Sequence, residues 1–338
     1  GAAAGQARAA GRDRGAGDPK KSVGLLCQGR SPVAVFRFIA AEKANHAVAT
    51  ICRLLGVSRS GYYAWATRPR STRAVADVAM TDRIREIHCD SDGTYGSRRV
   101  HAQLRRDGVL VNKKRVERLM RVGEIVGAHV PSRRRRSDAD GLLGIEGVKA
   151  WPDLVGRDFA PQAPDQLWCA DMKQIPTGEG VLHLASVLDC FSRRVVGWRM
   201  AGVADEPLVA SAVRAAVAQR RPGRGLIHHS DRGCQYTAVT FAKGLTASGI
   251  VASFSAKGTP YDNSVKESFF ATLEKEHLRS RTFETHVEAR ASLFRYIEAW
   301  YNPRRLHSTL GYRSPDEAER DYHDQSALTA STSTERAA

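Results

Sequence analysis

The pattern of hydrophobic and polar positions changes near residue 160. Before that point apolar residues recur at helical spacing, which predicts a series of short helices. After it the chain carries runs rich in apolar and β-branched residues, at 167–172, 181–191 and 194–200. Such runs are typical of strands, so the sequence predicts an all-α N-terminal half and an α/β C-terminal half.

The first helical segment is expected over residues 36–70. Apolar Ile51 and Leu55 stand on one helix face, a turn follows at 56–58, and a second helix carries Tyr62 and Trp65. A helix, a glycine-containing turn and a capped second helix indicate a helix-turn-helix. Residues 1–35 are rich in Gly, Ala and Arg without periodicity, and we expect a disordered leader there.

A second helical segment, with more charge, is expected over 74–130. Ser97 begins one helix and Asn112 caps another, whose apolar stripe is Val116, Leu119 and Met120. The other faces of that last helix carry Lys113, Lys114, Arg115, Arg118 and Arg121. A basic face of this kind can lie along DNA phosphates or enter a major groove, although a solvated basic helix has the same pattern.

The C-terminal half reads as three strands, then helix, strand, helix, strand and helix. The first strands are joined by the turn 178–180, and a long Ala/Val-rich helix runs from about 206 to 221. This order predicts a mixed, five-stranded central sheet flanked by helices, an arrangement that several α/β folds share. The expected boundaries are a basic linker at 131–160, a core at 161–282, a helical segment at 283–322 and a disordered tail at 323–338.

Charge is concentrated in the N-terminal half. The chain has a formal charge of +16, and residues 1–160 carry 30 basic and 16 acidic residues, net +14. Such an excess points to a polyanionic partner, most often nucleic acid. Arg133, Arg134, Arg135 and Arg136 are consecutive and repel one another unless an anion neutralises them, so we interpret them as a DNA-clamping linker.

Other compositional features exclude whole classes of protein. No apolar run approaches the ~18 residues needed to span a bilayer, so a membrane protein is not expected. The six cysteines form no C-x-x-C pair, which argues against a disulfide or zinc framework and for reduced thiols. We therefore expect a cytoplasmic protein associated with the nucleoid.

Three acidic residues are hard to explain as surface charge. Asp171 interrupts an apolar strand, Asp231 follows the end of the next strand, and Glu267 lies in the first turns of a helix. Carboxylates that converge repel one another unless a cation is present, and oxygen ligands favour Mg²⁺ or Mn²⁺. Two such ions would support phosphoryl transfer. Asp189 is a rival for the first ligand, and His228 and His229 adjoin the site but more readily pack or orient Asp231.

Four ordered blocks carry a resemblance to a known family. Residues 167–171 (LWCAD), 187–198 (VLDCFSRRVVGW), 228–236 (HHSDRGCQY) and 262–270 (DNSVKESFF) resemble the catalytic core of Asp-Asp-Glu transposases and integrases. The 35 residues between Asp231 and Glu267 match the spacing of that superfamily. Residues 95–101, 112–120 and 301–315 are similar to segments of the insertion-sequence three family of bacterial transposases.

This resemblance implies an RNase H-like core that cleaves DNA at the ends of a mobile element and joins the freed 3′-hydroxyl to another strand. Asp171, Asp231 and Glu267 would hold the metal ions. The implied partners are the terminal inverted repeats, target DNA, further copies of the chain and an upstream-frame protein. A catalytically impaired remnant that only binds DNA and represses is the alternative function. A retroelement integrase is a weaker alternative, because its His/Cys zinc spacing is absent.

The sequence also departs from the family pattern. Ala170 and Lys173 stand where threonines are usual, and Glu274 stands seven residues after Glu267, where a basic residue often holds DNA phosphate. An acid there would repel phosphate, so either Lys275 replaces the basic residue or strand binding is weaker. The predicted DNA contacts are Arg98, Arg99, Lys113, Lys114, Arg115, Arg118, Arg133, Arg134, Arg135, Arg136 and Lys275. Arg304, Arg305 and His307 are further candidates, whereas the tryptophans at 168, 198 and 300 are expected to pack in the core.

Overall fold

The structure is a computed structural model that describes residues 31–69, 71–129, 152–255 and 264–337 of the 338-residue chain. The chain forms two compact units, residues 1–80 and residues 81–338. Helix α5, Thr72–Asp90, runs from the first unit into the second. Among the described residues no helix is long and apolar enough to cross a membrane.

The first unit holds three short helices, α2 (Pro32–Glu42), α3 (Val48–Leu54) and α4 (Arg59–Ala66). The Ser58 side chain caps α4 by accepting a hydrogen bond from Gly61 N at 2.8 Å. Ile39, Ile51 and Tyr62 meet in the core of this bundle. The helix-turn-helix expected around residues 56–58 is present, and its first helix begins at Pro32, four residues before the predicted start.

Two further helices follow α5 in the second unit, α6 (Ser97–Arg106) and α7 (Lys113–Val122). Asn112 caps α7, as the sequence predicted, by accepting a hydrogen bond from Lys114 N at 2.8 Å. The apolar stripe of α7 is buried together with Val100 and Leu104 of α6. Burial of these stripes leaves the basic positions on the outer faces of the helices.

The central sheet has five strands in the order β3-β2-β1-β4-β5. They span β1 (Leu167–Thr177), β2 (Gly180–Asp189), β3 (Val195–Ala201), β4 (Ile227–Ser230) and β5 (Val251–Phe254). The first three are antiparallel, whereas β4 runs parallel to β1 and β5 parallel to β4. Thr177 pairs with Gly180 around a tight turn, and the φ of +109° at Gly180 favours glycine. The predicted mixed sheet is confirmed.

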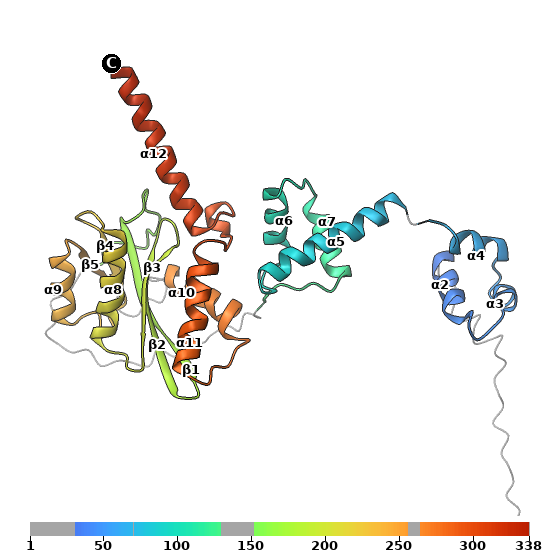
Figure 1. The fold of residues 1–338 in the computed structure, drawn as a ribbon, viewed down its shortest axis with the longest axis horizontal. Coiled ribbons are helices and arrows are strands. Elements are labelled where there is room, and N and C mark those ends of the chain that lie inside the picture. Colours follow the sequence, from blue (N-terminus) through green and yellow to red (C-terminus); the bar gives the residue numbers. More distant parts are fainter. Residues whose placement is uncertain (1–30, 70, 130–151, 256–263, 338) are drawn as a thin grey trace, which may run out of the picture. The chain divides into compact units, whose positions relative to one another are not determined.

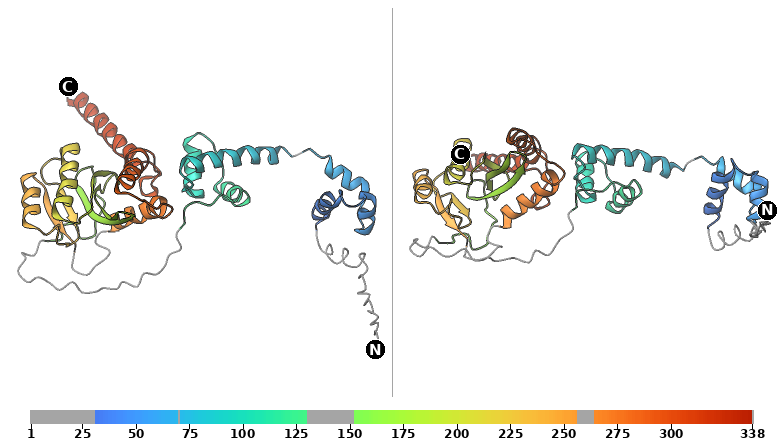
Figure 2. Two further views of the ribbon diagram at one scale, coloured as in Figure 1. Left: turned by 60° about the horizontal axis from the view of Figure 1, so that its bottom comes forward. Right: turned by 90° about the horizontal axis from the view of Figure 1, so that it is seen from below.

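Helices cover both faces of the sheet, as Figures 1 and 2 show. On one face lie α8 (Glu206–Arg220) and α9 (Val239–Ala247). On the other lie α10 (Ser264–Leu273), the π-helical turn η2 (Glu274–Leu278), α11 (His286–Phe294) and a second π-helical segment, η3 (Arg295–Tyr301).

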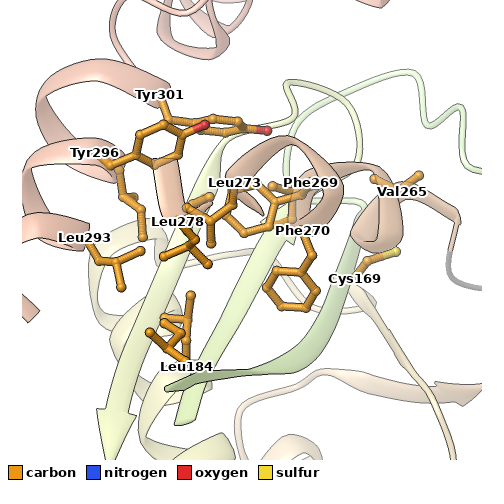
Figure 3. Packing of buried hydrophobic residues seen from close by; sticks show 14 of the residues in the cluster. Cys169, Leu184, Val265, Phe269, Phe270, Leu273, Leu278, Leu293, Tyr296 and Tyr301 are labelled. Carbon is orange, nitrogen blue, oxygen red and sulfur yellow. The ribbon is translucent and has the colours of Figure 1, made fainter. Parts of the chain in front are cut away.

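Alternate residues of β1 serve the two hydrophobic cores. Trp168 and Ala170 pack with α8 and α9, and Cys169 and Ile175 pack with α10 and α11. Figure 3 shows the second of these cores. A strand buried on both faces reads as a continuous apolar run, which is why its sequence shows little alternation. Because side chains alternate along a strand, Asp171 lies on the face that α10 covers.

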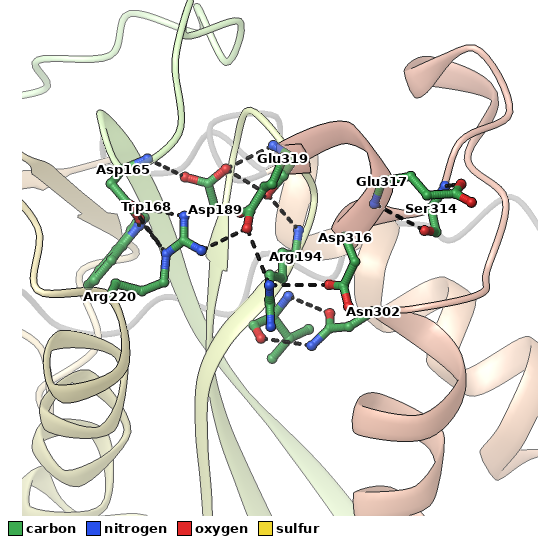
Figure 4. Close-up of polar contacts among 12 residues, drawn as sticks. Asp165, Trp168, Asp189, Arg194, Arg220, Asn302, Ser314, Asp316, Glu317 and Glu319 are labelled. Carbon is green, nitrogen blue, oxygen red and sulfur yellow. Dashed lines mark hydrogen bonds and ion pairs between the residues drawn. The ribbon is translucent and has the colours of Figure 1, made fainter. Parts of the chain in front are cut away.

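The C-terminal segment contains the short η4 (Ser308–Leu310) and the long helix α12 (Pro315–Ala337). The start of α12 is anchored to the sheet by the polar network drawn in Figure 4. Arg220 donates to Glu319 at 2.7 Å and pairs with Asp165 at 2.8 Å, and the Asn302 amide bonds both backbone atoms of Val195 at 3.0 Å. The expected tail from residue 323 is wrong for the part up to Ala337, which continues α12.

The expected linker also needs correction at its end. Val155 and Phe159 are buried in the core that α10 covers, and Leu154 N donates to Ser253 Oγ at 3.0 Å. Residues 152–160 therefore belong to the domain built around the central sheet, because their apolar side chains complete one face of the sheet. Residues 131–151 of the predicted linker, including the four consecutive arginines, and the leader up to residue 30 lie outside the described residues.

Candidate active site and nucleic-acid-binding surfaces

Asp171 and Asp231 lie just past the point where the parallel pairing of β1 with β4 ends. The last pair is Cys169 with His229, and each acid follows two residues later, Asp171 within β1 and Asp231 directly after the end of β4. In parallel sheets the carboxyl ends of neighbouring strands form the usual binding edge. Asp171 is partly buried and accepts a hydrogen bond from Met172 N at 2.7 Å, whereas Asp231 is exposed and accepts one from Gly233 N at 3.1 Å.

Glu267 comes to this edge from a third element. It lies in the first turn of α10, which packs on β1, and its side chain is exposed. The pKa of Asp171 is raised to about 6, chiefly by burial and in addition by the charges of Asp231 and Glu267, while Lys266 opposes the shift. The three acids predicted from the sequence therefore interact electrostatically at one place.

The acids do not form a closed ligand set in this conformation. No group of three or more His, Cys, Asp or Glu side chains in the described residues is placed to hold a metal ion. Two observations nevertheless fit a cation at this edge. The pKa of Asp171 is raised by burial and also by the negative charges beside it. Burial and the charges of Asp171 and Asp231 likewise raise the pKa of the Tyr236 hydroxyl, which has no hydrogen-bond partner among the described residues. A bound cation would relieve that repulsion.

Lys266 is the residue that sequence reasoning missed. Its side chain is 0% exposed, and its ammonium donates to Ser186 O at 2.9 Å and Ser186 Oγ at 2.5 Å. Ser186 is the residue paired with Asp171 across β1 and β2. Burial lowers the pKa of Lys266 to about 8, and the charge of Asp171 opposes the shift. The available signal was its position on the helical stripe with Phe269, Phe270 and Leu273, which placed a lysine on a buried face.

The rival candidates Asp189, His228 and His229 are buried in environments that suit a structural role. Asp189 is fully buried and accepts hydrogen bonds from Asp165 N, Ser192 N and Ser192 Oγ, each at 2.8 Å (Figure 4). Burial raises its pKa to about 6. His229 contacts Ser253 Oγ at 3.0 Å, and burial lowers the pKa of His228 to about 3. These side chains brace the strands that carry Asp171 and Asp231.

Two residues that depart from the family pattern, Lys173 and Glu274, form an ion pair. Lys173 lies on the same face of β1 as Asp171, and its ammonium is 2.9 Å from a carboxylate oxygen of Glu274. The side chains are 22% and 47% exposed. Glu274 is thereby neutralised, so the repulsion of phosphate expected from the sequence is reduced. The third departure, Ala170, is buried on the opposite face against α8 and α9 and does not reach the acids.

The predicted DNA contacts fall into different environments. Arg98, Lys113 and Lys114 are exposed, and Lys113 lies 3.6 Å from Glu117 along α7. Arg115 and Arg118, also on α7, are partly buried, and Lys275 is partly buried in η2. Arg133, Arg134, Arg135 and Arg136 lie outside the described residues. No observation here tests whether these residues touch DNA, and they stay predictions.

Arg99 and Arg305 have a partner within the chain. The Arg305 guanidinium bonds both oxygens of Glu276 at 2.7 Å, and Arg99 donates to the same carboxylate at 3.2 Å and to Leu306 O at 3.0 Å. Glu276 is buried, with 2% of its side chain exposed. Arg305 is 3% exposed and its guanidinium is bound to Glu276, so it does not stand on the open surface as the sequence suggested. Both arginines hold α6 against the C-terminal segment. Tyr95, just before α6, adds to this contact because its hydroxyl accepts a hydrogen bond from Leu306 N at 2.8 Å.

Comparison with known proteins agrees with this architecture. Residues 161–260 and 248–315 match family models described as integrase core domains, and residues 76–136 match an HTH-like domain. A 31 kDa protein of insertion element IS600 from Shigella sonnei is 36% identical over 277 residues, 82% of this chain and 100% of that protein. The transposase InsF of insertion sequence IS3A from Escherichia coli K12 is 34% identical over 83% of this chain and 97% of its own length.

The chain belongs to the IS3-type family of insertion-element transposases. Its integrase core is the five-stranded sheet with its flanking helices, so the predicted family and the RNase H-like fold class are confirmed. The catalytic core domain of HTLV-2 integrase, solved in complex with magnesium, is 16% identical with a TM-score of 0.35 and covers 47% of this transposase and 98% of that chain.

Proposed function

We propose that this transposase binds the ends of a mobile DNA element, cleaves the DNA there and joins the freed 3′-hydroxyl to a target strand. The observation that carries the proposal is the meeting of Asp171, Asp231 and Glu267, from three separate elements, closely enough that the charges of Asp231 and Glu267 add to the effect of burial on the pKa of Asp171. Membership of the transposase family supports the same reaction.

The three carboxylates would hold Mg²⁺ or Mn²⁺, as two ions, because hard oxygen ligands suit these cations. When bound, the ions would activate the attacking oxygen and stabilise the leaving oxygen of the phosphodiester. Asp171 is held in place by its strand and by Met172 N, whereas Asp231, which accepts from Gly233 N, and Glu267 are exposed on a loop and in a first helical turn and have more room to adjust. The chain thus offers one fixed ligand and two adaptable ones.

Lys266 and Lys173 offset part of the negative charge at this edge of the sheet. Lys266 ties α10 to β2 through Ser186 beneath Asp171, which fixes the helix that carries Glu267. Lys173 neutralises Glu274 next to the same edge. A DNA strand that approaches the carboxylates therefore meets less negative charge than the sequence suggested, which favours an active enzyme over an impaired remnant.

Double-stranded DNA, both terminal repeats and target, is the proposed partner. The exposed Arg98, Lys113 and Lys114, with Arg115, Arg118, Lys275 and Arg133–Arg136, are the proposed contacts. Phosphate contacts of this kind set affinity and position rather than sequence preference. Because two element ends must be joined, the active form is proposed to be an oligomer on DNA, with an upstream-frame protein as a possible additional partner.

The test is metal-dependent cleavage of a terminal-repeat duplex by the full chain. Asp231→Asn and Glu267→Gln should abolish cleavage while retaining DNA binding, because each keeps the side-chain shape and removes a metal ligand. Asp321→Asn, at an exposed ion pair with Arg313, is the matched control and should cleave like the wild type. Cleavage that survives both active-site substitutions would contradict the assignment. A wild type that binds the repeat tightly and never cleaves it would favour the repressor instead.

A further inference from the structure

A second polar site lies beside α10. A cavity of about 300 Å³ is lined by Arg99, Arg193, Arg305 and His307 together with serine and threonine side chains of α10 and the 308–309 turn. Three arginine side chains therefore line one space. Burial, followed by the charges of Arg305, Arg99 and Arg193, holds the pKa of His307 well below its usual range, so this imidazole is neutral.

The positive charge of this cavity is only partly compensated. Arg99 and Arg305 share the single carboxylate of Glu276. The Arg193 side chain has no hydrogen-bond or ion-pair partner within the ranges that the structure describes. Two of the three cationic charges thus lack a counter-charge, and a partly buried, unpaired guanidinium is stabilised by an anion.

The backbone at Arg193 adds a further sign of function. Its φ is +63°, in the left-handed region that non-glycine residues seldom adopt. The turn between β2 and β3 places it there, with Arg193 N donating to Asp189 O at 2.9 Å. Strained positions that persist in a well-packed turn are concentrated at ligand sites.

Hydroxyl groups complete the lining. The side chains of Ser268, Thr272, Ser308 and Thr309 make no hydrogen bond to another described residue. Guanidinium and hydroxyl groups are the donors that proteins use on phosphate oxygens, and the nearby acid, Glu276, is already occupied by arginines. The cavity therefore suits a phosphate group rather than a base or a cation.

The cavity lies close to the acids on the same helix, α10, which points to the DNA backbone as the source of the phosphate. Ser264, Ser268 and Thr272 form one stripe of α10, and Glu267 lies on the neighbouring, solvent-exposed stripe. Neighbouring stripes of a helix lie ~5–6 Å apart, and a DNA strand advances ~3.4 Å per nucleotide, so the two sites are roughly two nucleotides apart.

We propose that the cavity formed by Arg99, Arg193 and Arg305 binds a backbone phosphate of the DNA strand that crosses α10, a few nucleotides from the scissile position. This proposal rests on the proposed function of the chain. Arg193 supplies the unpaired cation, the hydroxyl groups of α10 donate to the phosphate oxygens, and the contact sets the register of the strand over Asp171, Asp231 and Glu267.

Binding of a terminal-repeat duplex by the full chain, in EDTA and over a range of salt concentrations, tests the contact. Arg193→Gln should lower the affinity about tenfold and reduce the slope of log affinity against log salt by about one. Arg320→Gln makes the same charge change at an exposed position on α12, outside the cavity, and is the matched control. Arg193→Lys should recover most of the slope, and Arg193→Asn, which tolerates the left-handed backbone, replaces Arg193→Gln if that variant does not fold.

A duplex with one neutral methylphosphonate, moved stepwise along the strand, locates the phosphate. One position about two nucleotides from the scissile bond should weaken binding by the wild type and have no effect on Arg193→Gln. The proposal is overturned if Arg193→Gln and Arg320→Gln behave alike, or if no position shows this loss of sensitivity. It is also overturned if inorganic phosphate protects the wild type from thermal unfolding through Arg193 while DNA binding is unchanged. Because EDTA prevents cleavage, these results stand whether or not the chain proves to be a strand transferase.

Discussion

Neutralising Asp171 should stabilise the metal-free protein while it removes activity. The pKa of this carboxyl lies at about 6 in the folded chain against 3.8 ordinarily, because burial and the charges of Asp231 and Glu267 disfavour ionisation more than Lys266 favours it. Each pKa unit corresponds to ~1.4 kcal/mol, so the ionised side chain lowers the free energy of unfolding by about 1–3 kcal/mol at pH 7. Asp171→Asn should recover that amount.

The pH dependence follows from the direction of the shift. Between pH 4 and 6 the folded state binds a proton at Asp171 that the unfolded state does not, so the stability of the wild type rises as the pH falls through 6. Asp171→Asn lacks this contribution. In EDTA its urea midpoint should therefore exceed that of the wild type at pH 7, and the difference should shrink towards pH 4. Added Mg²⁺ should stabilise the wild type alone and reverse the order.

Asp189 provides the matched control, since burial raises its pKa to about 6 as well. Its carboxylate accepts three hydrogen bonds, so Asp189→Asn places an amide group against donors and should lower the stability by about 1–3 kcal/mol. Its response to Mg²⁺ should match that of the wild type. If Asp171→Asn is destabilised in EDTA at pH 7 as Asp189→Asn is, the repulsion among the three acids is not what the structure implies.

Further predictions concern the other charged groups. Glu276→Gln leaves Arg99 and Arg305 without their shared carboxylate and should lower the free energy of urea unfolding by about 3–5 kcal/mol. Asp321→Asn, at an exposed ion pair, should change it by less than about 1 kcal/mol, and equal effects of the two substitutions would refute the stabilising role of the buried pair. Glu274→Gln should raise affinity for duplex DNA about two- to fivefold at low salt and Lys173→Gln should lower it, as measured by filter binding, and no change in either would remove the role of this pair. Alanine at all four residues Arg133–Arg136 should weaken binding to every DNA sequence and reduce the salt slope by about 3–4, and an unchanged slope would remove the clamp.

The sequence by itself determined the elements and the order of the acids. Strands β1 to β3 and helix α8 lie within a few residues of their predicted positions, and the later strands and helices follow in the predicted order, because periodicity, glycine turns and helix caps act over short distances along the chain. The positions of Asp171 in a strand, Asp231 after one and Glu267 at the start of a helix are likewise local properties. The error at the C-terminus was local too, since a polar stretch after Tyr322 carried no apolar stripe and still continued α12.

Only the tertiary structure decided which charges meet. Lys173 and Glu274 are 101 positions apart and each looked unfavourable alone, yet they neutralise each other at 2.9 Å. Arg99 was predicted to contact DNA, and in the structure its guanidinium is paired with Glu276, which also holds Arg305. Lys266 read as an ordinary helix residue until its face was seen to be buried beneath Asp171. Coulomb energies depend on distance in space and on local burial, and neither quantity is written in the spacing of residues along a chain.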